Sequence, residues 1–399
     1  MNQPTSQATH VAIACGGTGG HLFPGLAVGR EILRRGGRVT MFVSEKEVDR
    51  HASASATGMS IVAQPSVGLT RGRWLGFAGG MWRSARLAGK YFRENPPRVV
   101  LAMGGFTSAG PVLAGRRAGA ACFLHDSNVI PGRANRWLSN FAKAIFVAFP
   151  QAGAHFKKPT EVTGTPVRAE FQPMESVRAR AELGLRGDDP VLLIMGGSQG
   201  ATGINRLAQE ALPALVERFP RLQFIHLAGG AELATVQSAY QRLGVKALVQ
   251  RFSTEMHLAL GAATLALSRA GGSSLAELAV MGTATVLVPY PEAAENHQEA
   301  NAESFVRQGA AVSVAQNQIS GVAFAELLVN LLADPQRRSQ LSVRIRALAV
   351  PDAAACIVDA MSAAAGLVWD AAPETRSTLT KAWDSAAHRN PSPLFHPAS

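Results

Sequence analysis

Short apolar runs alternate with amphipathic stretches along most of the chain. In the first half, apolar runs predict strands at residues 11–15, 39–43, 99–103, 121–124 and 144–147. Helical spacing of apolar positions predicts helices between them, as at 24–35 and 111–118. The second half restarts the pattern, with strands expected at 191–195, 223–227, 247–249, 265–267 and 285–288 and helices at 205–218 and 273–281. This alternation predicts an α/β protein with a doubly wound parallel sheet in each half.

Two of the apolar runs end in glycine-rich turns. The first reads VAIACGGTGGHLFP (11–24) and the second VLLIMGGSQGA (191–201). Glycine permits a positive φ and a close backbone approach, and the helix that follows offers unpaired N–H groups and the positive end of its dipole, so each turn favours an anion. Neither turn is a Walker A sequence, because no Gly-Lys-Ser/Thr follows. The first lacks the third glycine of a dinucleotide fingerprint, although Glu45 lies where a ribose-binding acid is expected.

The chain has room for two domains with a ligand between them. Its 399 residues are 47% hydrophobic and 17% charged, as in a folded globular protein. A Pro-containing stretch at 163–171 is the expected hinge. We expect a disordered N-terminus at 1–9, an N-terminal domain at 10–164 and a C-terminal domain at 165–349. Beyond these, we expect a helix within 350–369 that packs back on the N-terminal domain and a disordered, Pro- and Ser-rich tail at 370–399.

Charge and cysteine content narrow the classes of partner. The formal net charge of +11 favours nucleic acid, an anionic membrane surface or phosphorylated substrates. Nucleic acid is the least supported, because we find no zinc-ligand spacing, no Lys/Arg run of five and no RNA-binding aromatic motif. The three widely spaced cysteines predict reduced thiols, and no apolar stretch is long enough to span a bilayer, so we expect a cytoplasmic protein, at most peripheral to a membrane.

One segment combines the features of a membrane-surface helix. Residues 69–92 interleave Trp74, Leu75, Phe77, Met81 and Trp82 with Arg71, Arg73, Arg83, Arg86 and Lys90. Aromatic and apolar side chains among basic ones are typical of an interfacial helix on anionic lipid. An amphipathic helix packed on a protein core is the alternative.

Seven motifs, taken in order, resemble the MurG family of glycosyltransferases. They are GGTGGH (16–21), AMGGFTSAGP (102–111), HDSNVIPGRANR (125–136), TGTPVR (163–168), MGGSQGA (195–201), SRAGGSSLAELAVMG (268–282) and NHQEANA (296–302). The resemblance spans residues 8–368. It implies a GT-B fold, in which an N-terminal Rossmann-like domain binds a lipid-linked acceptor and the membrane and a C-terminal one binds UDP-N-acetylglucosamine (UDP-GlcNAc). The activity it implies is inverting transfer of GlcNAc to the C4 hydroxyl of undecaprenyl-diphospho-N-acetylmuramoyl-pentapeptide, for peptidoglycan synthesis.

The same resemblance implies no cofactor and no metal, and the sequence has no Asp-x-Asp metal motif. It places the enzyme at the cytoplasmic face of the inner membrane, with other cell-wall synthesis proteins as further partners. Glu277 would bind the ribose hydroxyls, Ser198 the α-phosphate, and Phe252 with Ser253 the uracil. The remaining donor-binding residues that the resemblance implies are Thr18, Gly19, Gly20, Arg168, Gln199, Gly200, His297 and Gln298, and Asn301 would contact the transferred sugar.

Acceptor binding is implied for Gly104, Gly105, Thr107, His125 and Asn128. The chain departs here from the family pattern, because it has His-Asp-Ser-Asn at 125–128 where His-Glu-Gln-Asn is expected. The reaction needs a general base, for which His21 and Asp126 are the two candidates. An imidazole has an unperturbed pKa of about 6.5 and a carboxylate one of about 4, which favours His21.

The sequence leaves two other classes of protein open. A sugar-nucleotide enzyme of the same architecture, such as a UDP-sugar 2-epimerase or a transferase to a soluble acceptor, would share both glycine turns. A nucleotide-binding scaffold without catalysis would also share them, and the departure at Asp126 and Ser127 is its only sign. Dependence on a polyprenyl diphosphate acceptor separates these classes from the transferase.

Overall fold

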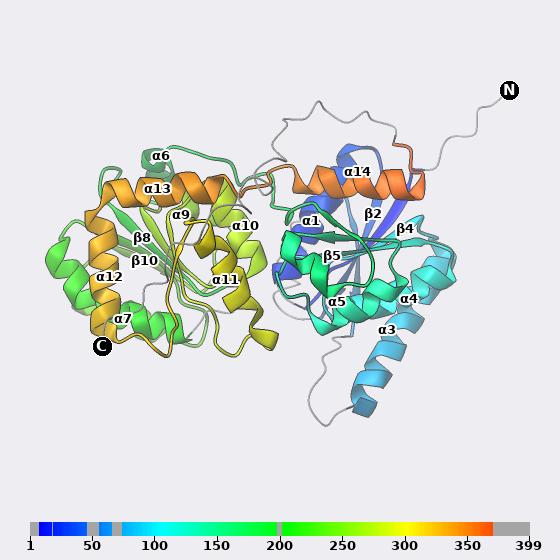
Figure 1. Cartoon of the computed structure of the whole chain (residues 1–399), viewed down its shortest axis with the longest axis horizontal. Coiled ribbons are helices and arrows are strands. Elements are labelled where there is room, and N and C mark those ends of the chain that lie inside the picture. The colour runs from blue at the N-terminus through cyan, green and yellow to red at the C-terminus, as the bar shows by residue number, and fades with distance from the viewer. Residues whose placement is uncertain (1–7, 18, 46–55, 66–73, 198–201, 370–399) are drawn as a thin grey trace. The chain divides into compact units, whose positions relative to one another are not determined.

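The computed structural model describes residues 8–17, 19–45, 56–65, 74–197 and 202–369 (Figure 1). These residues form two compact units, one made of 8–169 and 350–369 and the other of 170–349. Thr18, Ser198, Gln199, Gly200 and the tail at 370–399 lie outside the described residues.

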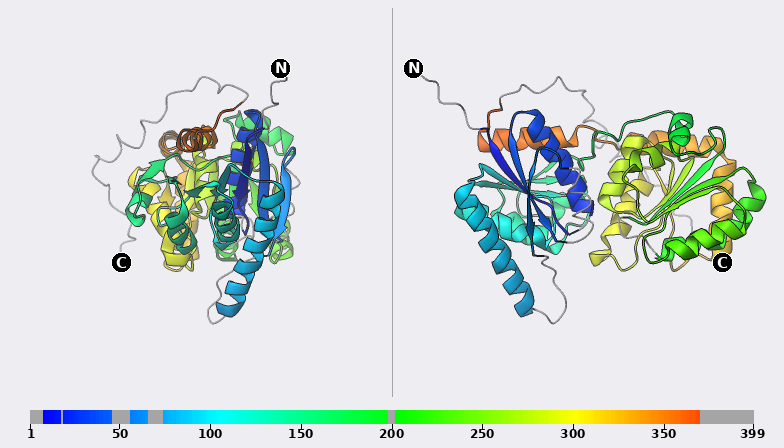
Figure 2. Two further views of the ribbon diagram at one scale, coloured as in Figure 1. Left: turned by 90° about the vertical axis from the view of Figure 1, so that its right-hand side faces the viewer. Right: turned by 180° about the vertical axis from the view of Figure 1, so that it is seen from behind.

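The first unit is built on a parallel seven-stranded sheet. Its strand order is β3 (Ser60–Gln64), β2 (Arg38–Ser44), β1 (His10–Ala14), β4 (Val99–Ala102), β5 (Ala121–Asp126), β6 (Ala144–Val147) and β7 (Thr160–Val162). Alternate side chains of β1 enter two cores. Val11 and Ile13 pack under α1 (Gly19–Arg34) and α14 (Ala353–Ala365), and Ala12 and Ala14 pack under α3 (Trp74–Glu94) and α4 (Ala109–Arg117). The helices thus cover both faces of the sheet (Figure 2).

The second unit repeats this design with six parallel strands. Their order is β10 (Ala247–Gln250), β9 (Gln223–Leu227), β8 (Val191–Met195), β11 (Leu265–Ser268), β12 (Thr285–Leu287) and β13 (Val312–Ser313). On one face α7 (Thr202–Arg218) packs beside α12 (Gly321–Ala333), and Phe324 lies in that core. The other helices are α6 (Ser176–Glu182), α8 (Leu233–Arg242), α9 (Met256–Ala262), α10 (Gly272–Met281), α11 (His297–Arg307) and α13 (Pro335–Arg346).

The ten strands expected from the apolar runs are all confirmed, each to within two residues at either end. Three further strands, β3, β7 and β13, were not expected. β3 has only the short apolar run at 61–63, and β7 and β13 contain one apolar residue each. They lie at sheet edges, where β3 and β7 leave several side chains exposed and β13 is only half-buried. An edge strand buries too little to require apolar residues in sequence. The first helix begins at Gly19 and contains Pro24, whereas proline at that position predicted a start five residues later.

The helix α14 belongs to the first unit although it follows the whole second unit in sequence. It packs on α1, where the guanidinium of Arg35, 1% exposed, pairs with the Asp359 carboxylate at 2.5 Å and with Glu31 at 2.6 Å. Trp369 donates its indole N–H to the Ser362 hydroxyl at 2.7 Å. Within the described part of the chain no helix is both long and apolar enough to cross a membrane.

Candidate functional site

Each sheet has one point at which the strand order reverses. In the first unit this point lies between β1 and β4, and in the second between β8 and β11. At such a point the connections that leave two neighbouring parallel strands run to opposite faces of the sheet. An opening is therefore left at the carboxyl ends of these strands, in which α/β proteins bind ligands. The glycine turns at 16–20, 104–105 and 196–197 and the pair Gly271-Gly272 all follow these strands.

In the first unit His21 lies against the Gly104-Gly105 turn. His21 is in the first turn of α1 and is half-buried. Gly104 has a φ of 124°, and a Cβ atom there would lie 2.6 Å from Cε1 of His21. Glycine is therefore required at 104 both for its backbone conformation and for the close approach of the imidazole. The structure thus brings together the candidate base and the turn expected to bind the acceptor diphosphate.

Two hydroxyl groups next to this turn bond to the backbone around it. The Thr107 hydroxyl donates to the Gly16 carbonyl at 2.6 Å, and the Ser108 hydroxyl donates to the carbonyls of Ala14 and Gly104 at 3.0 and 2.8 Å. Both side chains are buried. Thr107, expected to bind the acceptor, therefore fastens the two glycine turns of this unit to each other.

The Asp126 carboxylate is buried at the end of β5 and is surrounded by donors. Its Oδ1 accepts from the backbone N–H of Asn128 at 2.9 Å and from the Asn128 amide at 3.3 Å, and its Oδ2 accepts from the Asn135 amide at 2.6 Å. Burial raises the pKa of Asp126, and these hydrogen bonds, with one from the Gly132 backbone, oppose the rise. The carboxylate holds together the loop from β5 to α5 (Arg133–Leu138).

His125 precedes Asp126 and is fully buried. Its Nε2 lies 2.8 Å from the Gly164 carbonyl oxygen. A carbonyl only accepts, so Nε2 carries the proton. Burial lowers the pKa of His125 to about 4, so the ring is neutral at physiological pH.

In the second unit the described residues expected at the donor lie past the carboxyl ends of β10, β11 and β12. Glu277 is half-buried on α10, which begins at Gly272, the second glycine of the pair that follows β11. Phe252 is half-buried past β10, and the Ser253 hydroxyl accepts from the Glu255 backbone N–H at 3.1 Å.

The first turn of α11 carries His297 and Gln298. The Nδ1–H of His297 donates to the Ala294 carbonyl at 2.8 Å, which leaves Nε2 as an acceptor. Gln298 Oε1 accepts from the Tyr290 backbone N–H at 3.0 Å. Asn301, expected at the sugar, is fully buried and donates to the Ala270 carbonyl at 3.0 Å. Asn301 thus ties α11 to the residue before the glycine pair.

Arg168 was expected at the nucleotide, and the structure groups it with the first unit. Its guanidinium lies over the Phe23 ring of α1, 4.8 Å from the ring centre. That contact places the positive charge of Arg168 beside Phe23, two residues after His21 on α1. Gly19 and Gly20 form the start of the same helix.

Sequence reasoning passed over Asn135 and Arg269. Both lie in motifs quoted above, Asn135 nine residues after Asp126 and Arg269 directly before the Ala-Gly-Gly turn. Arg269 is buried and donates to the Val288 and Pro289 carbonyls and to Gln316 Oε1 at 2.9, 3.1 and 2.7 Å. A polar residue beside a glycine turn was the available signal for both.

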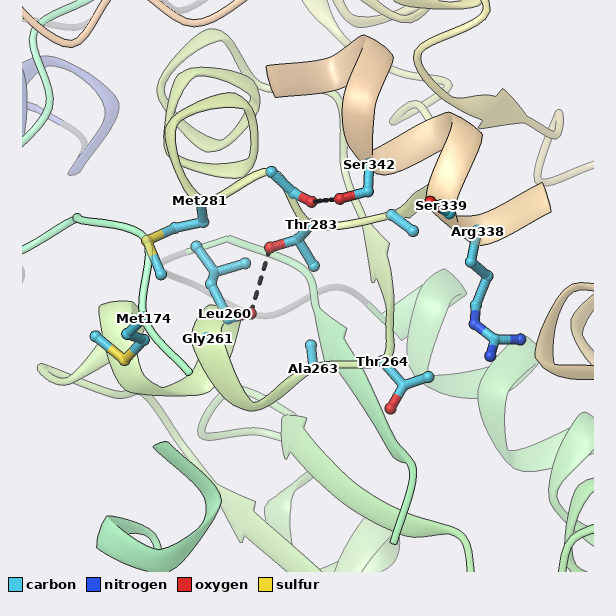
Figure 3. A pocket seen from close by; sticks show the side chains of 12 residues that line it. Met174, Leu260, Gly261, Ala263, Thr264, Met281, Thr283, Arg338, Ser339 and Ser342 are labelled. Carbon is cyan, nitrogen blue, oxygen red and sulfur yellow. Dashed lines mark hydrogen bonds between the residues drawn. The ribbon is translucent and has the colours of Figure 1, made fainter. Parts of the chain in front are cut away.

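A cavity of about 240 Å³ lies elsewhere in the second unit (Figure 3). Its walls include Met174, Met281, Thr283 and Arg338, near the amino ends of β11 and β12. The Arg338 guanidinium donates to the Leu331 and Leu332 carbonyls at the end of α12. The expected donor residues follow the carboxyl ends of the strands, so this cavity is a separate feature.

Both units match models of one enzyme class. Residues 11–147 match the glycosyltransferase family 28 N-terminal domain, and residues 191–356 match the glycosyltransferase family 28 C-terminal domain. The fold and the positions of the glycine turns therefore define a glycosyltransferase with two Rossmann-like domains of the GT-B type.

Curated relatives narrow the class. Two proteins named "UDP-N-acetylglucosamine--N-acetylmuramyl-(pentapeptide) pyrophosphoryl-undecaprenol N-acetylglucosamine transferase" are similar over most of the chain. The one from Citrifermentans bemidjiense is 35% identical over 88% of this chain and 98% of its own, and the one from Xanthomonas euvesicatoria is 38% identical over 89% and 81%. The crystal structure of Acinetobacter baumannii MurG superposes with a TM-score of 0.68 at 26% identity, over 89% of this chain and 99% of that one. The chain belongs to the MurG family of N-acetylglucosamine transferases.

Proposed function

We propose that this chain transfers GlcNAc from UDP-GlcNAc to the C4 hydroxyl of undecaprenyl-diphospho-N-acetylmuramoyl-pentapeptide, converting lipid I to lipid II. The observation that carries the proposal is the match to curated transferases of that name over 88% of the chain. The glycine turns at both switch points support it, since both substrates carry a diphosphate and such turns bind phosphate without a metal.

The second unit is proposed to hold the donor. The Glu277 carboxylate accepts hydrogen bonds from the ribose hydroxyls, and Ser198, Gln199 and Gly200 with the following helix bind the diphosphate. Phe252 and Ser253 take the uracil. His297 and Gln298 face the transferred sugar, for which the Nε2 acceptor of His297 is suited. Asn301 supports them from the buried side of α11.

The first unit is proposed to hold the acceptor and the base. The Gly104-Gly105 turn binds the acceptor diphosphate, and Asn128 lies beside the acceptor sugar. His21 removes the proton of the C4 hydroxyl as its oxygen bonds to the anomeric carbon, and the bond from that carbon to the UDP oxygen breaks. UDP then leaves with the electron pair, and the anomeric centre inverts. The dipole of α1 and the Arg168 guanidinium supply positive charge in this unit.

Asp126 is the weaker candidate for the base. Both of its oxygens already accept hydrogen bonds, three of them from Asn128 and Asn135. The Gly132 backbone N–H is a fourth donor, so the roughly four acceptor positions of the carboxylate are all occupied, and removing a proton from a substrate hydroxyl would require one of these bonds to break. We assign Asp126 to fixing the loop that presents Asn128, and His21 to the chemistry.

The membrane surface is proposed to meet the outer face of α3. Trp82 is 62% exposed, and the Arg86 guanidinium lies over its ring, 5.4 Å from the ring centre. Arg83 and Lys90 are exposed beside them. The helix extends past the edge of its sheet (Figure 2). A peripheral site on the cytoplasmic face of the membrane would bring a polyprenyl acceptor within reach.

The decisive test is a transfer assay with radiolabelled UDP-GlcNAc and a short-chain polyprenyl-diphospho-muramoyl-pentapeptide. We expect label in the lipid-linked product only when the acceptor is present. Formation of UDP-N-acetylmannosamine without acceptor would instead indicate a 2-epimerase. Donor binding with no product of either kind would indicate a scaffold.

A further inference from the structure

Within the described residues the chain passes between its two units at Ala169–Glu170 and at Ala349–Val350. The segment before the first passage, residues 163–168, has neither helix nor strand, and its first four residues are buried. Buried irregular backbone needs hydrogen-bond partners that no ladder supplies. The Gly164 carbonyl accepts from the His125 imidazole at 2.8 Å and, at the longer distance of 3.3 Å, from the Thr163 hydroxyl.

Gly164 also touches the second passage. Its φ is 74°, and a Cβ atom built on it would lie 2.6 Å from Cβ of Val350. Glycine is required there for its left-handed conformation and for this contact. The two passages therefore meet at Gly164 and Val350, and His125 is bonded to the residue where they meet.

The other side of His125 belongs to the proposed acceptor loop. Its backbone carbonyl accepts from the Asn135 amide at 3.3 Å, and that amide also binds Asp126 Oδ2 at 2.6 Å. Asp126 in turn holds Asn128. Gly164 is thus linked to the loop at 126–135 through two hydrogen bonds of His125, one from its imidazole and one to its backbone carbonyl.

The His125 imidazole is not accessible to a substrate. His125 is 0% exposed, and its Nδ1 is buried without a hydrogen-bond partner among the described residues. A substrate cannot reach the ring without displacing protein. The ring therefore has a single proton donor, and Gly164 takes it.

We propose that His125 is a positioning residue that couples the passage between the units to the acceptor loop, and that it does not contact the acceptor. This inference rests on the proposed function for its link to catalysis. Motion at residues 163–169 is transmitted through the imidazole to Asp126, Asn128 and Asn135.

The first test compares His125→Leu with His125→Gln in the full-length chain. Leucine removes the donor at similar size, whereas the glutamine amide nitrogen can replace Nε2. Hydrogen exchange followed by mass spectrometry should be about tenfold faster at both 163–169 and 126–135 in His125→Leu, as expected for loss of one buried hydrogen bond. Gln should restore most of the protection. kcat/KM for the acceptor should fall with exchange, and the Kd for UDP-GlcNAc should stay within about twofold.

His10 supplies a matched control. It is a buried histidine at the amino end of the same sheet, within hydrogen-bond distance of the Pro96 carbonyl and the Thr40 hydroxyl. His10→Leu should leave exchange at both segments unchanged, although it also removes buried hydrogen bonds. Equal acceleration by His10→Leu would show general loosening of the unit and overturn the proposal.

Val350→Ala tests the coupling from the opposite side and also serves if His125→Leu does not fold. It removes two methyl groups that lie against Gly164. Val350 itself makes none of the hydrogen bonds that link Gly164 to the acceptor loop. We expect faster exchange at 126–135 in this variant, and none of that increase when His125→Leu is already present. Faster exchange confined to 163–169 would refute the coupling. Absence of GlcNAc transfer by the wild-type chain would refute the proposed function instead, and the exchange results would still decide the coupling.

Discussion

At the scale of single residues, His21 and Asp126 differ in how deeply they are buried. Asp126 is buried with both oxygens bonded to amides of its own loop, whereas His21 is half-buried against the Gly104-Gly105 backbone. A general base must be able to reach the proton it removes. The burial of Asp126 within its own loop therefore favours His21 as the proposed base.

We expect His21→Ala to lower kcat by roughly 100-fold, the usual effect of losing a general base, with donor affinity almost unchanged. Asp126→Ala should instead raise the acceptor KM and lower the melting temperature, because it removes the acceptor of hydrogen bonds from Asn128 and Asn135 that hold the loop after β5. Steady-state kinetics and calorimetry on both variants check this. Near-normal kcat in His21→Ala, with none in a folded Asp126→Ala, would reverse the assignment.

Glu277→Ala should weaken UDP-GlcNAc binding by about 1.5–3 kcal/mol, the usual contribution of hydrogen bonds to a charged group. The side chain is half-buried on α10, so the fold should survive the change. Titration calorimetry measures the affinity, and Glu326→Ala, an exposed acid on α12, is the control. Donor affinity equal in both variants would remove Glu277 from the site.

At the scale of elements, α3 has two unlike faces. Ala88 and Phe92 are buried in the core of the first unit, while Trp82, Arg83 and Arg86 face outward. The sequence showed the mixture of aromatic and basic residues but could not tell which of them pack inward. The exposed half of the mixture is the part that can meet lipid.

Trp82→Ser combined with Arg86→Ser should lower binding to phosphatidylglycerol vesicles by about tenfold or more, given about 1 kcal/mol for each basic residue near an anionic surface and a further loss from the indole. Turnover of a water-soluble acceptor analogue should not change. Vesicle sedimentation measures binding, and Val343→Ser, 68% exposed on α13, is the control. Equal loss of activity on soluble and long-chain acceptors would indicate damaged folding.

The packing of α14 on α1 includes an ion pair between Arg35 and Asp359, which are 324 residues apart in the sequence. Asp359→Ala leaves the buried Arg35 with Glu31 as its remaining carboxylate partner. We expect a loss of about 1–2 kcal/mol, below the value for a fully buried pair because Asp359 is 32% exposed. Scanning calorimetry should show a lower melting temperature for the first unit. Glu161→Ala, an exposed acid on β7 of the same unit, should melt as the wild type does.

At the scale of the whole molecule, the apolar runs were enough to predict two doubly wound sheets, because central parallel strands are buried on both faces. The site was predictable only as far as its glycine turns and quoted motifs. Which of the expected site residues are buried could not be predicted from the sequence. Thr107, His125 and Asn301 were expected at substrates, yet each is buried and bonded to backbone, which no local pattern reveals.

Three buried histidines make the stability of the whole protein sensitive to mild acid. His10, His125 and His226 lie in β1, β5 and β9, and burial lowers their pKa values to about 4, about 4 and about 3. In the unfolded chain each titrates near 6.5. Between about pH 6.5 and 4 the unfolded state therefore binds protons that the folded state does not, so stability is present above this window and is lost as the pH falls through it.

Each histidine adds at most about 1.4 kcal/mol per pH unit inside that window. We expect the melting temperature to be flat from pH 8 to 7 and to fall from pH 6.5 to 5, with net proton uptake on unfolding at pH 5, measured by calorimetry in buffers of different ionisation enthalpy. Burial raises the pKa of Asp126, so this carboxyl group releases a proton on unfolding and lowers the net uptake below that of the three histidines. The carboxylates of Glu31 and Asp189, whose pKa values are lowered by their arginine partners, act only at lower pH, because unfolded carboxyl groups titrate near 4. His226→Gln should remove about one proton from the uptake. A melting temperature that stays constant down to pH 5 would show that these imidazoles are protonated in the folded protein, and the single-donor geometry of His125 would then be wrong as well.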